Sequence, residues 1–303
     1  MTPRHVPAER RRAVLAASLA ATLAVADAPA AVAQAPDFSK VHVKATKVSG
    51  NLHMLEGQGG TIGVLAGPDG AFMVDSQFAA LTDKIVAAIK QLAPGPIRFM
   101  VNTHIHGDHT GGNENFGKLG VTLLARQQLR DRLASGAKPS AAPALPVVTY
   151  DSPVTINMNG EAITLIPVPR AHTDGDTMVY FPTADVIMTG DFFRSVGYPY
   201  PDRNNGGTFN GLIAGLNAVI DLAKPSTKIL PGHGPIVDEG AVAAHRDMAL
   251  AVRAKVATLV QQGKTADEVI AAKPTADTDA RVDPGGSSSE RFLRALHTEL
   301  AAK

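Results

Sequence analysis

The sequence predicts an α/β protein, an αββα four-layer sandwich in which two mixed β-sheets lie face to face and helices cover their outer sides. Two observations indicate this fold. The chain falls into two successive halves, each with short apolar strands followed by helices. Histidine and aspartate motifs follow strands in both halves, and their chemistry requires the halves to meet. With 303 residues, of which 45% are hydrophobic and 19% charged, the chain can bury a large core.

The charge balance and the cysteine count exclude several classes of protein. The 29 basic residues nearly cancel the 28 acidic ones, so the composition does not predict a nucleic-acid partner. The sequence contains no cysteine. Disulfides, thiolate metal sites and a cysteine nucleophile are therefore excluded.

The first 33 residues have the layout of a secretory signal peptide. Four arginines, the last of them Arg12, precede an alanine-rich apolar run over residues 13–25, and the small residues 31–33 fit a cleavage site. Arg11 and Arg12 also fit a loose twin-arginine pattern, which leaves the Sec and Tat routes open. A membrane anchor is the alternative, but the run is short for a bilayer and rich in alanine. We expect export to the periplasm and a mature domain of residues 34–303 without stable membrane association.

The first half of the chain, up to about residue 150, is expected to form one sheet with its helices. Apolar runs predict strands over residues 61–66, 71–75, 97–102 and 121–124. A helix is expected between the second and third of these strands, because apolar residues recur there at helical spacing: Leu81, Ile85, Ala88, Ile89 and Leu92. Another helix is expected over residues 126–133.

The second half of the chain repeats this order of strands and helices. A segment rich in alanine, proline, serine and glycine, residues 135–146, is expected to link the halves. Strands are then expected over residues 154–158, 162–168, 178–181, 186–188 and 228–230, with a helix over 207–223 and a long helix after the last strand. Two capping boxes, Thr265/Glu268 and Ser287/Glu290, are expected to begin the last two short helices.

The densest chemical motif directly follows the strand over residues 97–102. There, three histidines and a carboxylate lie within six positions: His104, His106, Asp108 and His109. These side chains cannot all point the same way on regular structure, but in a turn they can face two adjacent points. The spacing therefore predicts a chelating loop with ligands for more than one metal ion.

Three further motifs follow other strands. His172 lies in a loop of small and acidic residues, Asp191 follows a glycine, and His233 lies between glycines and prolines. Together the motifs supply five histidines and two aspartates, about the number of ligands that two zinc ions with one bridging hydroxide need. Imidazoles and carboxylates without a thiolate favour zinc, with iron or manganese as alternatives.

The order of these motifs resembles the metallo-β-lactamase superfamily. An H-x-H-x-D-H loop, a downstream histidine, a G-D aspartate and a P-G-H-G histidine follow one another in that order. The resemblance implies a first metal ion on His104, His106 and His172, a second on Asp108, His109 and His233, and Asp191 as the bridge between them. It also implies a bridging hydroxide that attacks a carbonyl, with Asp108 as the catalytic residue that orients it and passes a proton to the leaving group.

Within the superfamily, the chain resembles the exported subclass B1 lactamases with one departure. Those enzymes carry a cysteine ligand where this chain has Asp191. Their lysine for the substrate carboxylate falls on Arg194, which could bind a carboxylate bidentately or be a solvated surface residue. Asn204 and Asn205 are candidate substrate or oxyanion contacts, with a simple turn before the next helix as the alternative.

The expected function is a zinc-dependent hydrolase that opens an amide, lactam, ester or lactone carbonyl of a small-molecule substrate. Activity like that of a β-lactamase is the leading interpretation. One alternative is a lactonase, esterase or thioesterase of the same superfamily. The other is a non-hydrolytic metal-binding accessory protein of a periplasmic redox or sulfur system. The substrate, the native metal and the oligomeric state are left open.

Overall fold

The computed structural model describes residues 1–2, 37–135 and 138–302. Residues Asp37–Lys303 make up one compact unit, and the architecture below is that of this unit. The predicted signal peptide lies outside the described residues, apart from residues 1 and 2. Among the described residues, none of the helices is both long and apolar enough to cross a membrane.

The first sheet has seven strands that lie side by side in the order of the chain. The first four strands pair antiparallel and the last four pair parallel, so the sheet is mixed. Its strands are β1 (Lys44–Ser49), β2 (Leu52–Glu56), β3 (Ile62–Gly67), β4 (Gly70–Val74), β5 (Ile97–Val101), β6 (Thr122–Arg126) and β7 (Val148–Tyr150).

The second sheet has five strands in the order β12-β11-β10-β9-β8. Only the pair β11–β12 is parallel, because a crossover that contains the helix Phe209–Leu222 connects these two strands. Short turns connect β8 to β9 and β10 to β11, and the loop over residues 168–176 connects β9 to β10. The strands are β8 (Val154–Met158), β9 (Glu161–Pro167), β10 (Thr177–Phe181), β11 (Val186–Gly190) and β12 (Lys228–Pro231).

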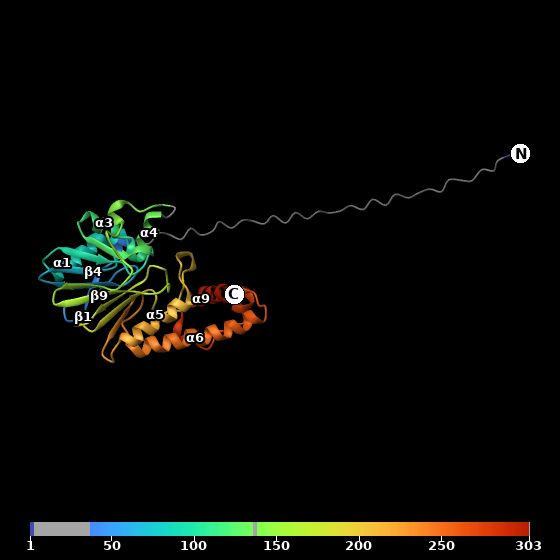
Figure 1. The fold of residues 1–303 in the computed structure, drawn as a ribbon. Helices are drawn as coiled ribbons and strands as arrows, with labels where there is room; N and C mark the ends of the chain where they lie inside the picture. The colour runs from blue at the N-terminus through green and yellow to red at the C-terminus, as the bar shows by residue number, and fades with distance from the viewer. Residues whose placement is uncertain (3–36, 136–137, 303) are drawn as a thin grey trace. The chain divides into compact units, whose positions relative to one another are not determined.

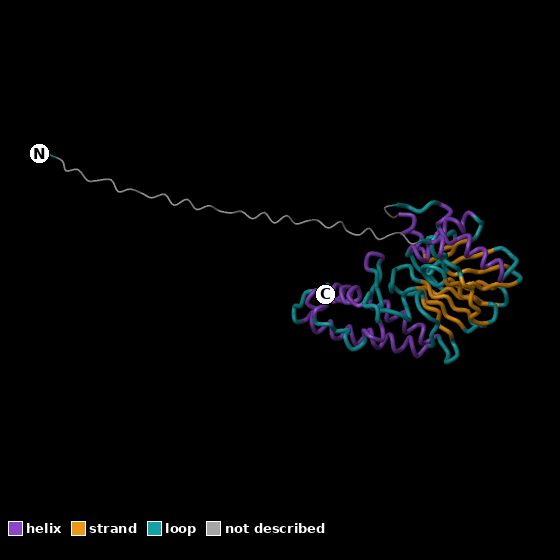
Figure 2. Tube along the Cα trace, turned by 180° about the vertical axis from the view of Figure 1, so that it is seen from behind, coloured by secondary structure: helices purple, strands orange, loops and turns teal. Residues whose placement is uncertain are grey.

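Helices cover the outer sides of both sheets (Figure 1), and the strands lie between them in the reverse view (Figure 2). One apolar cluster joins the first sheet to α1 and α3, and another joins the second sheet to α5 and the start of α6. The helices are α1 (Thr82–Leu92), α2 (Gly107–Thr110), α3 (Asn113–Lys118), α4 (Gln127–Ser135), α5 (Phe209–Leu222), α6 (Glu239–Gln261), α7 (Ala266–Ala271), α8 (Asp279–Val282) and α9 (Ser289–Ala301).

The central apolar cluster lies between the two sheets and takes side chains from both. Phe72 of β4 and Phe181 of β10 are fully buried there, with their rings edge to face at 6.3 Å. Burial of a side chain of this size stabilises the fold by roughly 1.5–3 kcal/mol. A separate cluster joins α6, α7 and α9 and also contains Tyr198 and Phe209. The four predicted layers are confirmed, and the chain adds a helical cluster at its C-terminal end.

The sequence analysis did not predict three of the strands, β1, β2 and β7. The hairpin β1–β2 precedes the first predicted strand, and β7 has only three residues. In β1, residues Lys44, Ala45 and Lys47 are exposed, so the strand lacks the apolar run by which the other strands are predicted. Backbone pairing to β2 makes it a strand, and a single sequence does not show that pairing.

The expected linker over residues 135–146 is wrong for its described part, residues 138–146. The short 3-10 helix Ala142–Ala144 packs on α3, where the Asn113 side chain donates a hydrogen bond to the Ala144 carbonyl. A side chain at Gly117 would clash with the carbonyl of Pro143, so the two segments are in close contact. The boundary between the sheets lies instead between β7 and β8.

One of the two predicted capping boxes is confirmed. Thr265 accepts from the backbone N–H of Glu268, and the Glu268 carboxylate accepts from the backbone N–H of Thr265. The second prediction is wrong, because α9 begins at Ser289 and Ser287 is exposed. The backbone N–H groups of Ser288 and Ser289 donate to Asp283 instead, a carboxylate that comes from before the helix.

We expect Thr265→Ala to lower the free energy of unfolding by about 1 kcal/mol, because the variant loses the cap of α7. Ser287→Ala is the matched control, and we expect a change below about 0.5 kcal/mol for this exposed residue. Urea unfolding followed by circular dichroism measures both. Equal losses for the two variants would contradict the assignment of these helix starts.

Candidate metal centre

The ends of four strands bring the predicted ligands to one edge of the two sheets. His104 and His106 follow β5, His172 follows β9, Asp191 follows β11 and His233 follows β12. In the second sheet, β9, β11 and β12 run in the same direction, because β10 lies antiparallel between β9 and β11. The carboxyl ends of such strands emerge at one edge. The structure groups all seven predicted ligands there.

The first group of side chains contains His104, His106, His172 and Asp191. Each offers one ligand atom, and these atoms lie within 4.8 Å of one another. His172 Nε2 lies 2.9 Å from His106 Nδ1 and 3.9 Å from Asp191 Oδ2. Side chains from both sheets thus converge on one point.

The second group contains Asp108, His109 and His233, with ligand atoms again within 4.8 Å. His233 Nε2 lies 3.1 Å from Asp108 Oδ2. Asp191 also reaches this group: its Oδ1 lies 3.3 Å from His109 Nε2, and its Oδ2 lies 3.3 Å from His233 Nε2. The carboxylate of Asp191 therefore stands between the two groups.

Buried polar atoms at the centre of the site indicate that it is built for a cation. Among the described residues, three of its buried atoms have no hydrogen-bond partner: His104 Nε2, His109 Nε2 and Asp191 Oδ1. The last two are 3.3 Å apart but lack hydrogen-bond geometry. Burial of polar atoms without partners costs free energy that a bound cation would recover. Imidazole nitrogens and carboxylate oxygens suit a divalent transition metal.

The charges of the ligands differ between the two groups. Burial lowers the pKa of His172 to about 4 and that of His104 well below its ordinary value, so both imidazoles are neutral and free to bind a metal. Burial would also lower the pKa of His109, but the charges of Asp75 and Asp191 raise it well above the ordinary value. For His233, burial is outweighed by its contacts with Asp108 and Asp191, which raise the pKa to about 9.

Asp75 supports the site and is a functional residue that the sequence analysis missed. Its Oδ2 accepts from His109 Nδ1 at 2.7 Å, and its two oxygens also accept from the backbone N–H and hydroxyl of Thr103. The residue is buried and has a φ of 62° at the end of β4. Such a carboxylate fixes which ring nitrogen of the histidine faces the metal. The signal in the sequence was an aspartate that ends an apolar strand next to the chelating loop.

A second group of supporting contacts comes from the segment that follows β11. Asp202 Oδ2 lies 2.8 Å from His106 Nε2, which leaves Nδ1 of that ring to face His172. The Tyr200 carbonyl accepts from His172 Nδ1 and leaves Nε2 for the site. Neither residue was singled out from the sequence, because only the folded chain brings them next to these histidines.

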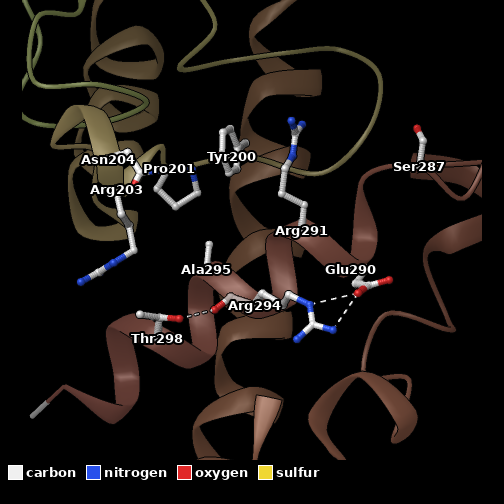
Figure 3. Close-up of a pocket in the computed structure, with 10 residues that line it drawn as sticks. All are labelled: Tyr200, Pro201, Arg203, Asn204, Ser287, Glu290, Arg291, Arg294, Ala295 and Thr298. Atoms are coloured by element: carbon white, nitrogen blue, oxygen red, sulfur yellow. Dashed lines mark hydrogen bonds and ion pairs between the residues drawn. The ribbon is translucent and has the colours of Figure 1, made fainter. Parts of the chain in front are cut away.

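The two predicted substrate asparagines lie in the short 3-10 helix Arg203–Asn205. The Asn205 side chain donates to Asp202 at 2.7 Å and accepts from Arg132 at 3.3 Å, so it supports the carboxylate that holds His106. Asn204 lines a pocket between this helix and α9 (Figure 3). Their role as substrate contacts stays a prediction.

Two glycines allow the ligands to approach the backbone. A Cβ atom at Gly60 would lie on the His109 ring, and one at Gly232 would lie on Asp191 Oδ1. Any larger residue at these positions would displace a ligand.

The site opens to solvent through a pocket of about 570 Å³ that is lined by Gln58, Gly59, Phe78, His106, Gly107, Asp108 and His233. Asp108 and His233 are about one quarter exposed, whereas His109 is fully buried. A substrate can therefore reach Asp108 from outside. Arg194 does not line this pocket but a separate one.

The fold and the site define a class of protein: two facing mixed sheets that hold two groups of metal-ligating side chains at one edge. The family model of the metallo-beta-lactamase superfamily matches residues 55–245, well over half of the chain. The chain belongs to this superfamily.

A hydroxyacylglutathione hydrolase from Nitrosococcus oceani is 31% identical over 134 residues, which are 44% of this chain and 46% of the relative. The chain spans about half the length of the curated relatives it matches.

Solved structures share the fold. A metallo-beta-lactamase from Pontibacter korlensis has a TM-score of 0.58 at 18% identity, over 68% of this chain and 99% of that protein. The stereoselective inverting sec-alkylsulfatase Pisa1 from Pseudomonas sp. has a TM-score of 0.69 at 17% identity, over 85% of this chain and 50% of that protein.

We expect Asp75→Asn to weaken metal binding at the group of Asp108, His109 and His233 by about 10–100-fold, because His109 loses the carboxylate that orients it. Metal binding at the group of His104, His106 and His172 is expected to stay unchanged. Zinc content after dialysis against a competing chelator measures both ions. Asp151→Asn, an exposed carboxylate, is the control, and equal zinc content in the two variants would contradict the role of Asp75.

Proposed function

We propose that the chain is a metal-dependent hydrolase with two zinc ions at the seven-residue centre. The observation that carries the proposal is the position of Asp191, which belongs to the first ligand group and lies 3.3 Å from both histidines of the second. One carboxylate can therefore join two ions. Membership in the superfamily and the hydrolase name of the curated relatives support a hydrolase.

A residue of the chain, Asp108, is placed to transfer the proton in the reaction. When bound, the ions would polarise a carbonyl and lower the pKa of a water molecule. Burial would raise the pKa of Asp108, but the hydrogen bond with His233 and the charge of His109 outweigh it and lower the pKa. Asp108 is therefore ionised and lies at the mouth of the site, where it can take up a proton and deliver it to a leaving group.

For the substrate, we propose an ester or thioester carbonyl. The curated relatives are named hydroxyacylglutathione hydrolases, and an acylglutathione is a thioester. Asp191 also takes the place of the cysteine expected of a subclass B1 lactamase.

A β-lactam is the second candidate, because the fold is similar to that of a solved metallo-beta-lactamase. The non-hydrolytic accessory protein is a weaker alternative, because an ionised Asp108 at the mouth of the site suits proton transfer.

We expect the zinc-loaded protein to hydrolyse a thioester and an aryl ester faster than a chromogenic cephalosporin, a carbapenem or an aliphatic lactone. A chelator is expected to abolish turnover, and zinc is expected to restore it. Spectrophotometric rates across this panel decide the substrate class. Faster turnover of the two lactams would establish the β-lactam candidate instead.

Asp108→Asn tests the role of Asp108 on the same panel, because the substitution keeps the size of the side chain and removes its proton acceptor. A hydrolase is expected to lose about 10²–10⁴-fold in rate while the variant keeps His-bound zinc. If no substrate is turned over with two ions bound, the accessory-protein alternative replaces this proposal.

We also propose that the chain is exported to the periplasm. Its support is the arginine-rich start, the apolar run and the small residues 31–33 of the sequence. N-terminal sequencing of the periplasmic protein is expected to give a start at Gln34. Changing Arg11 and Arg12 to lysine is expected to block export only if the Tat route is used, and a full-length cytoplasmic protein would contradict export.

A further inference from the structure

We propose that Arg132 is a positioning residue of the metal centre, because its guanidinium group holds together the loop that carries His172 and the loop that orients His106. Arg132 lies on α4, which follows β6 of the first sheet, whereas both loops follow strands of the second sheet. It does not line the pocket of the metal centre, so it can act on the centre only through other residues. The inference rests on the metal centre of the proposed function.

Asp174 fixes the guanidinium group of Arg132 on the loop that carries His172. Arg132 Nε donates to Asp174 Oδ1 at 2.7 Å, and a second guanidinium nitrogen donates to Asp174 Oδ2 at 2.6 Å. Two parallel hydrogen bonds of this kind define how both planar groups are oriented. The side chains of Arg132 and Asp174 are 30% and 21% exposed, so solvent screens this pair less than an exposed one. Asp174 lies two residues after His172, and the pair therefore ties the ligand-bearing loop to α4.

The third guanidinium nitrogen of Arg132 reaches the short 3-10 helix that follows Asp202. It donates to the Asn204 carbonyl and to Asn205 Oδ1, each at 3.3 Å. The Asn205 side chain donates to Asp202 Oδ2 at 2.7 Å, and the same oxygen lies 2.8 Å from His106 Nε2. A continuous chain of hydrogen bonds therefore runs from Arg132 to a candidate metal ligand.

The two loops also contact each other through their backbones. The Asp174 N–H donates to the Asn205 carbonyl at 2.9 Å, and the Asp202 N–H donates to the His172 carbonyl at 2.8 Å. A shift of one loop would therefore move the other. Because one guanidinium group is bonded to both loops, it is placed to fix how His106 and His172 face each other, with their ring nitrogens 2.9 Å apart.

Two glycines allow α4 and the loops to approach each other closely. Gly206 has a φ of 78°, and a Cβ atom there would lie 2.5 Å from Asp174 Oδ2 and 3.0 Å from a guanidinium nitrogen of Arg132. A Cβ atom at Gly175 would lie 3.0 Å from the Cβ atom of Leu129, three residues before Arg132 on α4. Little space is left for the loops to rearrange, so the guanidinium group is held in one position.

Arg130, on the same helix, provides the contrast. Its guanidinium group donates to the Pro146 carbonyl at 2.5 Å. This contact ties α4 to the segment before β7 and involves neither of the two loops. Arg130 thus holds a segment of the first sheet, whereas Arg132 holds the loops of the metal centre.

The charges around Arg132 agree with its contacts. The hydrogen bond and the charge of Asp174, together with the charge of Asp202, raise the pKa of Arg132, although burial acts in the opposite direction. Carboxylates of both loops therefore favour the charged guanidinium group. A lysine keeps the charge but is a compact point charge, so it can pair with Asp174 without forming the two parallel bonds and reaching the 3-10 helix at the same time.

Arg132→Lys is the decisive variant, because it keeps the positive charge and removes the planar fork of donors. We expect zinc binding at the group of His104, His106 and His172 to weaken about tenfold, the lower end of the range for residues that orient metal ligands. Competition with a chromogenic chelator measures the dissociation constants. Arg130→Lys is the matched control on the same helix, and we expect it to leave zinc binding unchanged.

Two backgrounds assign the effect to one group of ligands. In His233→Ala, which removes a ligand of the other group, the loss caused by Arg132→Lys is expected to remain. In His172→Ala, which breaks the group that Arg132 supports, the loss is expected to disappear. A loss that is equal in both backgrounds, confined to His172→Ala or absent from both would overturn the positioning role.

A double-mutant cycle tests the path through Asp202. Asp202→Asn alone is expected to weaken zinc binding at the same group, because His106 loses the carboxylate that orients it. Adding Arg132→Lys to this variant is expected to cost much less than it does in the wild type, because the chain of hydrogen bonds is already broken. Independent and additive losses would overturn the proposal.

Zinc binding needs no turnover, which separates this inference from the proposed hydrolase. Weaker zinc binding in Arg132→Lys supports the positioning role even if no substrate is hydrolysed, a result that would count against the hydrolase alone. Hydrolysis by the wild type together with unchanged zinc binding in Arg132→Lys would overturn the positioning role and leave the hydrolase standing.

Discussion

The buried carboxylate of Asp191 is the contact on which the centre depends. It lies 3.3 Å from His109, which follows strand β5 of the first sheet, and 3.3 Å from His233, which follows strand β12 of the second sheet. Burial would raise its pKa, but the charge of His109 and the close contacts with both histidines hold it well below the ordinary value. The ionised group therefore joins ligands of both sheets. The sheets must face each other, with their strand ends at one edge, for this contact to exist.

Hydrogen bonds from supporting residues fix the orientation of three histidine rings in the site. Asp75, Asp202 and the Tyr200 carbonyl each hold the ring nitrogen that faces away from the centre, on His109, His106 and His172 in turn. Each contact fixes which nitrogen is left for a metal. The glycines at 60 and 232 allow the backbone to lie against the ligands. Groups outside the set of ligands therefore fix how the ligands are presented.

The C-terminal helices extend the site beyond the two sheets. The segment between Asp191 and Asp202 carries both a ligand and the supports of other ligands, and Tyr198 ties it to α8 and the helices around it. A helical cluster outside the two sheets therefore stabilises the segment that bears this ligand and these supports.

The sequence by itself determined the strands with apolar runs, the order of the layers and the seven candidate ligands, because these depend on local periodicity and on residue type. It did not reveal β1, whose exposed lysines break the apolar pattern, or the start of α9, which Asp283 caps from outside the helix. Only the tertiary structure decided the roles of Asp75 and Asp202. Their partners lie far away in the chain, and contacts of that kind follow from how the sheets and helices pack rather than from neighbouring residues.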